Sequence, residues 1–157
     1  MIESTIVPLS FITAPAVLMN GCAIIVNGTN IRYNLAVTQL RDFRVSIAGN
    51  DNRIALLYDD AQKAFALAKK RVKVQLIGLN LLYTAVGFFG LTTLLGLLGS
   101  FFGTSDNQVV EKFMYIMMIT ATVGTVTLSL AIVAFTYESF LGRLLVNMHI
   151  KSISSDN

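Results

Sequence analysis

The run Val74–Phe102, VQLIGLNLLYTAVGFFGLTTLLGLLGSFF, decides the fold class, because it holds 29 residues and no charged side chain. About 20 apolar residues in a helix span the hydrocarbon core of a bilayer. A second uncharged run, Phe113–Phe135 (FMYIMMITATVGTVTLSLAIVAF), contains 23 residues. Both runs predict helices that cross a membrane.

The overall composition favours lipid over water as the solvent of this chain. Of its 157 residues, 54% are hydrophobic and 13% are charged, whereas soluble domains carry about 25% charged residues. The length is compatible with one domain, and we expect residues 1–157 to form a single membrane domain. The formal net charge of +3 is interpreted as a topology signal beside membrane segments, and we predict no nucleic-acid partner.

An earlier apolar run, residues 6–26, is interrupted by Pro8, Pro15 and Asn20. Thr13 is a suitable helix N-cap, and proline suits the first turn of a helix, where its missing N–H is not needed. We therefore predict that the first span begins near Ala14 and covers residues 14–31. Residues 1–13 are predicted to form an interfacial segment, and whether they enter the membrane is left open.

Between the first two spans, residues 32–73 are predicted to form a long antiparallel helical hairpin. Apolar residues recur at alternating steps of three and four on both sides of the turn signal Gly49-Asn50-Asp51-Asn52, at Tyr33, Ala36, Leu40, Phe43, Ile47, Ile54, Leu57, Ala61, Ala64 and Ala68. Each arm is expected to continue directly from its neighbouring span and to project about 30 Å from the membrane.

The distribution of positive charge predicts the orientation. Of the 12 lysines and arginines, nine lie between the first two spans, at Arg32, Arg41, Arg44, Arg53, Lys63, Lys69, Lys70, Arg71 and Lys73. The positive-inside rule therefore places the hairpin and the tail, residues 137–157, in the cytoplasm. The N-terminus is then outside, with spans two and three at residues 74–102 and 113–136. The predicted fold is an all-α membrane protein with three transmembrane helices and a cytoplasmic hairpin.

The basic cluster just before the second span has two interpretations. Lys69, Lys70, Arg71 and Lys73 are candidate contacts for anionic lipid head groups, at about 1 kcal/mol per charge. The alternative is a stop signal that fixes topology and binds nothing in particular.

The candidate contacts for helix packing or for a partner are polar or small residues in and beside the spans. Buried amides join helices by hydrogen bonds, and small residues at four-residue spacing allow close approach. The set is Asn20, Asn80, Gly96, Gly99, Ser100, Gly103, Ala121, Thr125, Ser129 and Glu138. We expect Asn20 and Asn80 to bond between helices, and Glu138 to form an interfacial ion pair or cap, a proton relay, or a contact with a partner.

The sequence predicts no catalytic residue, no cofactor and no metal site. His149 is the only histidine and has no cysteine or carboxylate at ligand spacing. The glycines of the second span have no Lys-Ser/Thr pair near them, so a phosphate-binding loop is not predicted. We therefore expect a protein that is not an enzyme.

Several short motifs resemble the bacterial domain of unknown function 2721 family. They are Thr13-Ala14-Pro15-Ala16-Val17-Leu18-Met19, Asn30-Ile31-Arg32-Tyr33-Asn34, Gln39-Leu40-Arg41-Asp42-Phe43-Arg44 and Ala68-Lys69-Lys70-Arg71, with Glu138 and Leu141 after the third span. The resemblance covers nearly the whole chain, although that family places arginine directly after asparagine where this chain reads Asn30-Ile31-Arg32. It implies a small three-span membrane protein of bacteria, cyanobacteria included, and implies no activity.

Two functions remain open from the sequence. The preferred hypothesis is a non-enzymatic accessory, structural or assembly subunit of a larger membrane complex, in the bacterial cytoplasmic membrane or the thylakoid. Its partners would be membrane lipids and other membrane subunits, a photosynthetic or respiratory complex being one option. The alternative is a homo-oligomeric pore or transport module, in which several copies line a polar path.

Overall fold

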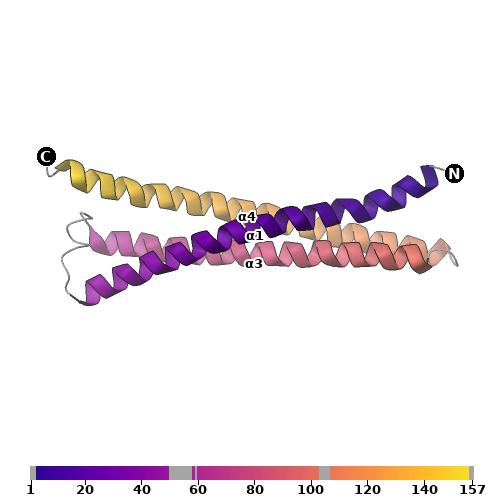
Figure 1. The fold of residues 1–157 in the computed structure, drawn as a ribbon, viewed down its shortest axis with the longest axis horizontal. Helices are drawn as coiled ribbons and strands as arrows, with labels where there is room; N and C mark the ends of the chain where they lie inside the picture. The colour runs from indigo at the N-terminus through magenta and orange to yellow at the C-terminus, as the bar shows by residue number, and fades with distance from the viewer. Residues whose placement is uncertain (1–2, 50–57, 59, 103–106, 156–157) are drawn as a thin grey trace. The chain divides into compact units, whose positions relative to one another are not determined.

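The computed structural model describes residues 3–49, 58, 60–102 and 107–155. These residues form three long helices, α1 (Glu3–Ala48), α3 (Ala61–Phe102) and α4 (Asn107–Ser155), and they contain no strand (Figure 1). Each of the three is long and apolar enough to cross a membrane. The all-α class and the three candidate spans are therefore confirmed, while the predicted turn at residues 50–52 lies outside the described residues.

Local hydrogen bonds mark the ends of two helices. The carboxylate of Asp60 accepts a hydrogen bond from the backbone N–H of Lys63 at 2.9 Å, which satisfies one of the free donors of the first turn of α3. At the end of α1, the N–H of Gly49 donates to the carbonyl of Val45 at 2.8 Å. Glycine is favoured directly after a helix for this purpose.

The predicted start of the first helix near Ala14 is wrong, because α1 begins at Glu3 and continues through Pro15. An interior proline removes one backbone hydrogen bond and usually kinks a helix. Helices in lipid tolerate this loss better, since neighbouring helices and local adjustments compensate for it. Here the Pro15 ring is buried within the structure, so packing against other helices offsets the lost bond.

The third helix extends beyond the predicted third span at both ends. It begins at Asn107, before residues 113–136, and ends at Ser155. Most of the predicted tail is therefore a continuation of the same helix. This continuation carries Glu138 and Leu145, both of which are buried.

The chain divides into two compact units. The first unit consists of Met1–Asn27 and Asn80–Leu130, and the second of Gly28–Leu79 and Ala131–Asn157. In both units, buried positions recur every seven residues along each helix, which is the repeat of helices that pack side by side in coiled coils. The buried positions are Pro15, Cys22, Thr29, Ala36 and Phe43 in α1, Ala68, Gln75, Leu82, Phe89 and Gly96 in α3, and Met117, Gly124, Ala131, Glu138 and Leu145 in α4.

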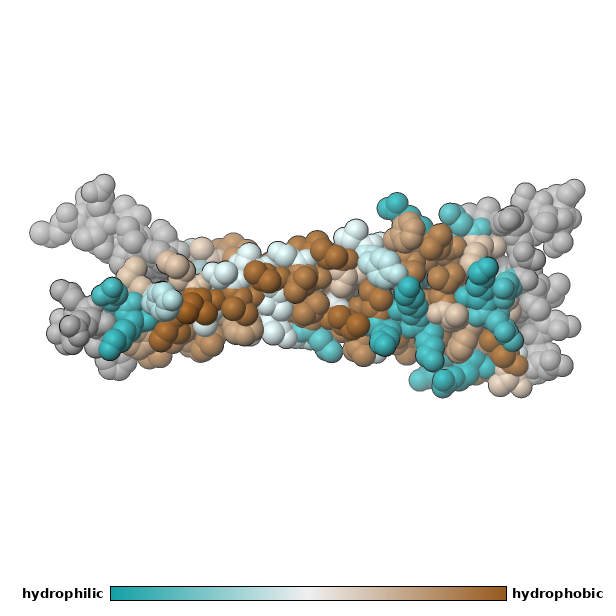
Figure 2. All heavy atoms as spheres, turned by 180° about the vertical axis from the view of Figure 1, so that it is seen from behind, coloured by the Kyte–Doolittle hydropathy of each residue, from teal (hydrophilic) through white to brown (hydrophobic). Residues whose placement is uncertain are grey.

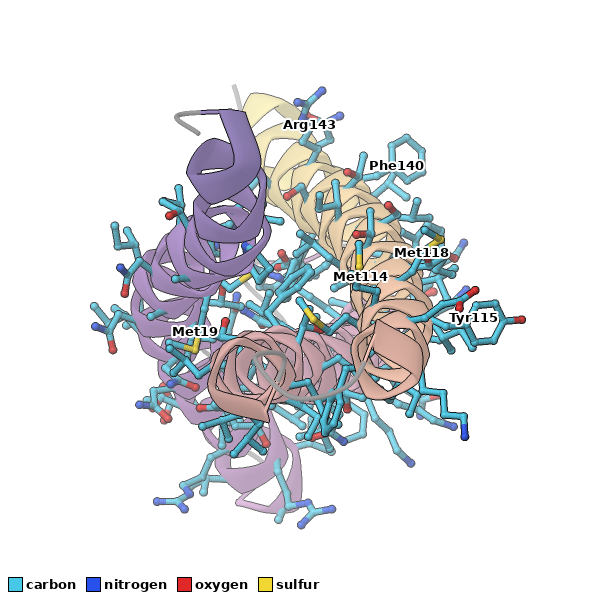
Figure 3. All side chains as sticks on the ribbon, turned by 90° about the vertical axis from the view of Figure 1, so that its right-hand side faces the viewer. Met19, Met114, Tyr115, Met118, Phe140 and Arg143 are labelled. Atoms are coloured by element: carbon cyan, nitrogen blue, oxygen red, sulfur yellow. The ribbon has the colours of Figure 1, made fainter. Side chains whose placement is uncertain are left out.

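In the first unit, aromatic rings of α3 pack against a glycine of α4. A Cβ atom built on Gly124 would lie 3.0 Å from Phe89 and 3.2 Å from Phe88. The hydroxyl of Thr92, which is also buried, lies 2.9 Å from that of Thr120. Met19 of α1 lies close to Gly90 of α3 (Figure 3). Small residues and hydroxyl groups therefore set the helix spacing in this unit.

In the second unit, the core is built from alanines around one aromatic ring. Phe43 of α1, Ala64 and Ala68 of α3 and Leu145 of α4 form one buried cluster. The ring of Phe43 also lies 5.3 Å from that of Tyr58, centroid to centroid. On the face that Figure 2 shows, hydrophilic side chains gather over the second unit, whereas apolar side chains cover much of the first unit.

Candidate functional site

The candidate site is a buried ion triad in the second unit, centred on the carboxylate of Glu138. Glu138 lies on α4, and its side chain is fully buried. The guanidinium of Arg32, on α1, donates from Nη2 to Oε2 at 2.9 Å. The guanidinium of Arg71, on α3, donates from Nε to Oε1 at 2.6 Å. One carboxylate therefore joins three helices.

The seven-residue repeat explains how these side chains meet. Glu138 occupies a buried position of the α4 repeat, between Ala131 and Leu145. Arg71 precedes the buried Gln75 by one helical turn, and residues four apart share a helix face. The Arg32 side chain is 50% exposed and that of Arg71 is 22% exposed. Both arginines therefore reach inward from the edge of the packed face, with part of each side chain still outside.

The charges of the triad do not balance, because two guanidinium groups surround one carboxylate. Removing an ion from water is costly, and a buried charge is tolerated only when it is paired and hydrogen-bonded. Both carboxylate oxygens of Glu138 accept a charge-assisted hydrogen bond, and such bonds are about twice as strong as neutral ones. Arg32 also contacts the hydroxyl of Ser139 at 3.3 Å.

A second buried polar side chain of this unit, that of Gln75, is fully buried and finds no partner. Its amide nitrogen and amide oxygen make no hydrogen bond with the described residues. A buried polar group without a partner costs about 1–3 kcal/mol. Gln75 therefore weakens the core of this unit, whereas the neighbouring turn of α3 strengthens it through Arg71.

A cavity of about 410 Å³ lies beside the triad. Arg32 and Arg71 line it together with residues of α4, namely Ser139, Gly142, Arg143, Val146 and Asn147. A Cβ atom on Gly142 would lie 3.5 Å from the guanidinium carbon of Arg71. This is an ordinary van der Waals distance, so the Arg71 guanidinium lies directly beside Gly142 of α4.

The basic cluster before the second span does not form one continuous patch. Arg71 turns inward to Glu138, and the ammonium of Lys70 lies 5.3 Å from the ring centre of Tyr137. Lys69 and Lys73 are exposed. Lys70 is exposed as well, so three of the four predicted head-group contacts are exposed, whereas Arg71 is partly occupied by the triad.

The two predicted intramembrane amides do not meet. Asn20 on α1 and Asn80 on α3 belong to the same unit, and both are exposed with no hydrogen bond between them. Their exposure follows from helix geometry, because neighbouring residues on a helix point in different directions and the buried residues nearest to them are Cys22 on α1 and Leu79 on α3. The interhelical contact in this unit is made by threonine hydroxyls instead.

Some of the predicted small residues are buried between helices and others are exposed. Gly96 is buried, and Gly99 packs near Phe113, with 3.5 Å between its Cβ position and Cβ of Phe113. The Ser100 side chain and Gly103 lie outside the described part of the chain. On α4, Ala121 is half-buried, whereas Thr125 and Ser129 are exposed and bond to carbonyls of their own helix. The residue that packs here is Gly124.

Arg32 and Gln75 were not among the site residues that the sequence predicted, and the arginines that pair with Glu138 are Arg32 and Arg71 and not the nearby Arg143. The seven-residue spacing of Gln75 from Ala68, and of Glu138 from Leu145, carried the missing signal. A polar residue at a repeat position that is otherwise apolar indicates a buried polar layer.

The triad is suited to holding helices together. Both oxygens of Glu138 are engaged by arginines, which do not give up their protons in proteins. Within the described residues, no cluster of three or more His, Cys, Asp or Glu side chains is placed to bind a metal ion. The side chain of His149 lies outside the described residues.

Comparison of the chain with protein-family models, with curated proteins and with solved structures finds no match.

Proposed function

We propose that this protein is a non-enzymatic accessory or assembly subunit of a larger membrane protein complex. The observation that carries the proposal is the exposure of two amide side chains, Asn20 and Asn80, on helices apolar enough to span a membrane. Hydrocarbon offers an amide no hydrogen-bond partner, and each unsatisfied polar group there is costly. Helices of other subunits would supply those partners.

The surfaces around the two amides are open enough to receive another helix. Gly21 follows Asn20, and Gly87 lies two turns after Asn80, and a Cβ atom on either glycine would meet nothing within 4 Å. Glycine beside a polar group lets a neighbouring backbone approach closely. In the most apolar 18-residue stretch of α1, and likewise in that of α4, 17% of the residues are buried. In the corresponding stretch of α3, 28% are buried. Most of the span surface is thus available to lipid or to partners.

The ion triad supports a scaffolding role. Breaking a buried ion pair costs about 3–5 kcal/mol, so Glu138 is expected to hold the cytoplasmic ends of the three spans in a constant arrangement. A rigid arrangement suits a subunit that presents surfaces to other proteins.

The orientation is part of the same proposal. We infer that residues 32–73 form an antiparallel hairpin on the cytoplasmic side, with the N-terminus outside. The contact of Phe43 with Tyr58, Ala64 and Ala68 supports antiparallel pairing of the two arms, and the excess of lysine and arginine in this segment supports the cytoplasmic side. The family resemblance favours a bacterial cytoplasmic or thylakoid membrane, with a photosynthetic or respiratory complex as one candidate partner.

A second candidate, a homo-oligomeric pore or transport module, is favoured by one specific observation. Asn20, Asn27 and Asn34 recur every seven residues on α1, and all three are exposed. An asparagine amide both donates and accepts hydrogen bonds. When identical helices lie side by side, their asparagines lie at the same depth and can therefore hydrogen-bond to one another. Such asparagines are known to specify helix pairing.

The experiment is extraction from native membranes in mild detergent, followed by native electrophoresis and mass spectrometry of the comigrating proteins. The proposal expects a discrete complex with unrelated subunits, which the double variant Asn20→Leu/Asn80→Leu weakens. The matched control is Thr122→Val/Thr125→Val, since these exposed threonines bond to their own helix. A species that contains only copies of this chain contradicts the accessory role and supports the second candidate.

A further inference from the structure

We propose that the cavity beside the ion triad binds a phosphate group through Arg32, Arg71 and Arg143, which together define the arginine pocket. The cavity measures about 410 Å³, and all three arginines line it. The proposal concerns a ligand site within the second unit and stands independently of the identity of any partner subunit.

The arginine pocket carries an excess of positive charge. Three guanidinium groups line or border the pocket, and the carboxylate of Glu138 is the only acidic group that the described structure pairs with any of them. Two positive charges therefore remain in excess. Arg143 makes no ion pair or hydrogen bond with a described residue, and its side chain extends outward from α4 (Figure 3).

The two arginines of the triad also keep N–H donors that the triad does not use. A guanidinium carries five N–H bonds, and toward the described residues Arg71 donates only from Nε, to Glu138. Within the same residues, Arg32 donates only from Nη2, to Glu138 and Ser139. The Arg71 guanidinium lies directly beside Gly142 of α4, which also lines the pocket. The triad therefore fixes both guanidinium groups in place, and most of their N–H groups stay available to a ligand.

The donors of the arginine pocket favour one kind of anion. Forked guanidinium groups bind phosphate with two parallel hydrogen bonds, and several arginines around one cavity suit an anion with three or more acceptor oxygens. Ser139 and Asn147 add a hydroxyl and an amide to the lining. Arg32 and Arg71 also lie next to the ends of the predicted spans, residues 14–31 and 74–102, at the depth of lipid head groups. The phosphate is thus that of an anionic lipid or of a free phosphate.

The test titrates the purified full-length protein in detergent with short-chain phosphatidylglycerol, with short-chain phosphatidylcholine and with inorganic phosphate. The main variant is Arg143→Gln, because Arg143 takes no part in the triad. Asn147→Asp adds an opposing charge to the same lining. Arg41→Gln is the matched control, since Arg41 is exposed and outside the pocket. Circular dichroism confirms that each variant is folded.

We expect Arg143→Gln and Asn147→Asp to raise the Kd for the anion about fivefold, the factor that corresponds to about 1 kcal/mol per charge, and Arg41→Gln to leave it unchanged. Preferential binding of phosphatidylglycerol that inorganic phosphate does not displace assigns the site to a lipid. Binding of inorganic phosphate with no preference between the two lipids assigns it to free phosphate. Equal affinities of Arg143→Gln, Asn147→Asp and Arg41→Gln for every probe would overturn the proposal.

Discussion

The two units use the same seven-residue repeat and fill it with different chemistry. In the first unit the buried repeat positions are apolar or small, as at Phe89 and Gly124. In the second unit the same repeat carries Thr29, Gln75 and Glu138 at buried positions. The comparison shows that the repeat sets which faces pack, whereas the residues placed on it decide whether packing or charge holds the helices together.

The two units also differ in where their polar side chains find hydrogen-bond partners. In the first unit, hydroxyl groups such as those of Thr84 and Thr122 donate to carbonyls of their own helix, so these hydroxyl groups do not depend on a neighbouring helix. In the second unit, Glu138 depends on arginines 106 and 67 residues away in the sequence. The second unit therefore has a long-range polar contact that one substitution removes completely.

The largest effect is expected from Glu138→Ala, which leaves Arg32 and Arg71 without their shared partner. We expect the free energy of unfolding to fall by about 3–5 kcal/mol, as measured by SDS titration in mixed micelles. Glu111→Ala is the control, because Glu111 is an exposed glutamate on the same helix. Equal effects of the two substitutions would show that the triad contributes nothing to stability.

The counterpart in the first unit is Gly124→Ala. Its Cβ would lie 3.0 Å from Phe89, so the ring or the helix must shift, and overpacking costs about 1–3 kcal/mol. Gly87→Ala is the matched control, since its Cβ meets nothing within 4 Å and alanine favours a helix more than glycine does. The same SDS titration should show a lower free energy of unfolding for Gly124→Ala and no decrease for Gly87→Ala. A decrease for Gly87→Ala without one for Gly124→Ala would contradict close packing at Gly124.

Gln75→Met is expected to stabilise the second unit. The substitution replaces a buried amide that makes no hydrogen bond with the described residues with an apolar side chain of similar length. We expect a gain of about 1–2 kcal/mol, seen as a higher Tm in detergent. A lower Tm would indicate that the amide has a partner and that the polar layer includes Gln75.

Thr92→Val tests the hydroxyl contact between α3 and α4. It removes the hydrogen bond to Thr120 with little change in shape, and hydrogen bonds between membrane helices average about 0.6 kcal/mol. Thr93→Val is the control, because the hydroxyl of Thr93 bonds to the carbonyl of Phe89 in its own helix. If both variants have the same unfolding free energy, this contact does not hold the first unit together.

The smallest effect is a pH dependence at Tyr58. Burial raises the pKa of its hydroxyl above 10.0, although a hydrogen bond with Gln39 partly opposes the shift. Because the folded protein then holds this proton more tightly than the unfolded chain, the stabilisation is present below pH 10 and is lost as pH rises through the folded pKa. We expect the Tm to fall at alkaline pH, and Tyr58→Phe should remove the part of this fall that comes from Tyr58. An unchanged alkaline profile would contradict burial of the Tyr58 hydroxyl.

The second and third spans were predictable because an uncharged run longer than 20 residues has few other structures open to it. The start of α1 was not, since a proline reads as a helix start in water but is tolerated inside a helix packed in lipid. Glu138 was recognised as an interfacial ion-pair candidate, yet its partners were not, because Arg32 and Arg71 reach it only after three helix faces have been matched. The exposure of Asn20 and Asn80 required the same information.

The central claim is that the exposed amides of the first unit face another protein, and the most direct measurement is photo-crosslinking in native membranes. A photoreactive side chain is placed at Ile24, one turn after Asn20 and 76% exposed, and separately at Val126 of α4, which is 55% exposed. We predict a discrete crosslink from Ile24 to an unrelated membrane protein, lost with Asn20→Leu/Asn80→Leu. Crosslinks from Ile24 to lipid alone, or only to copies of this chain, would contradict the account.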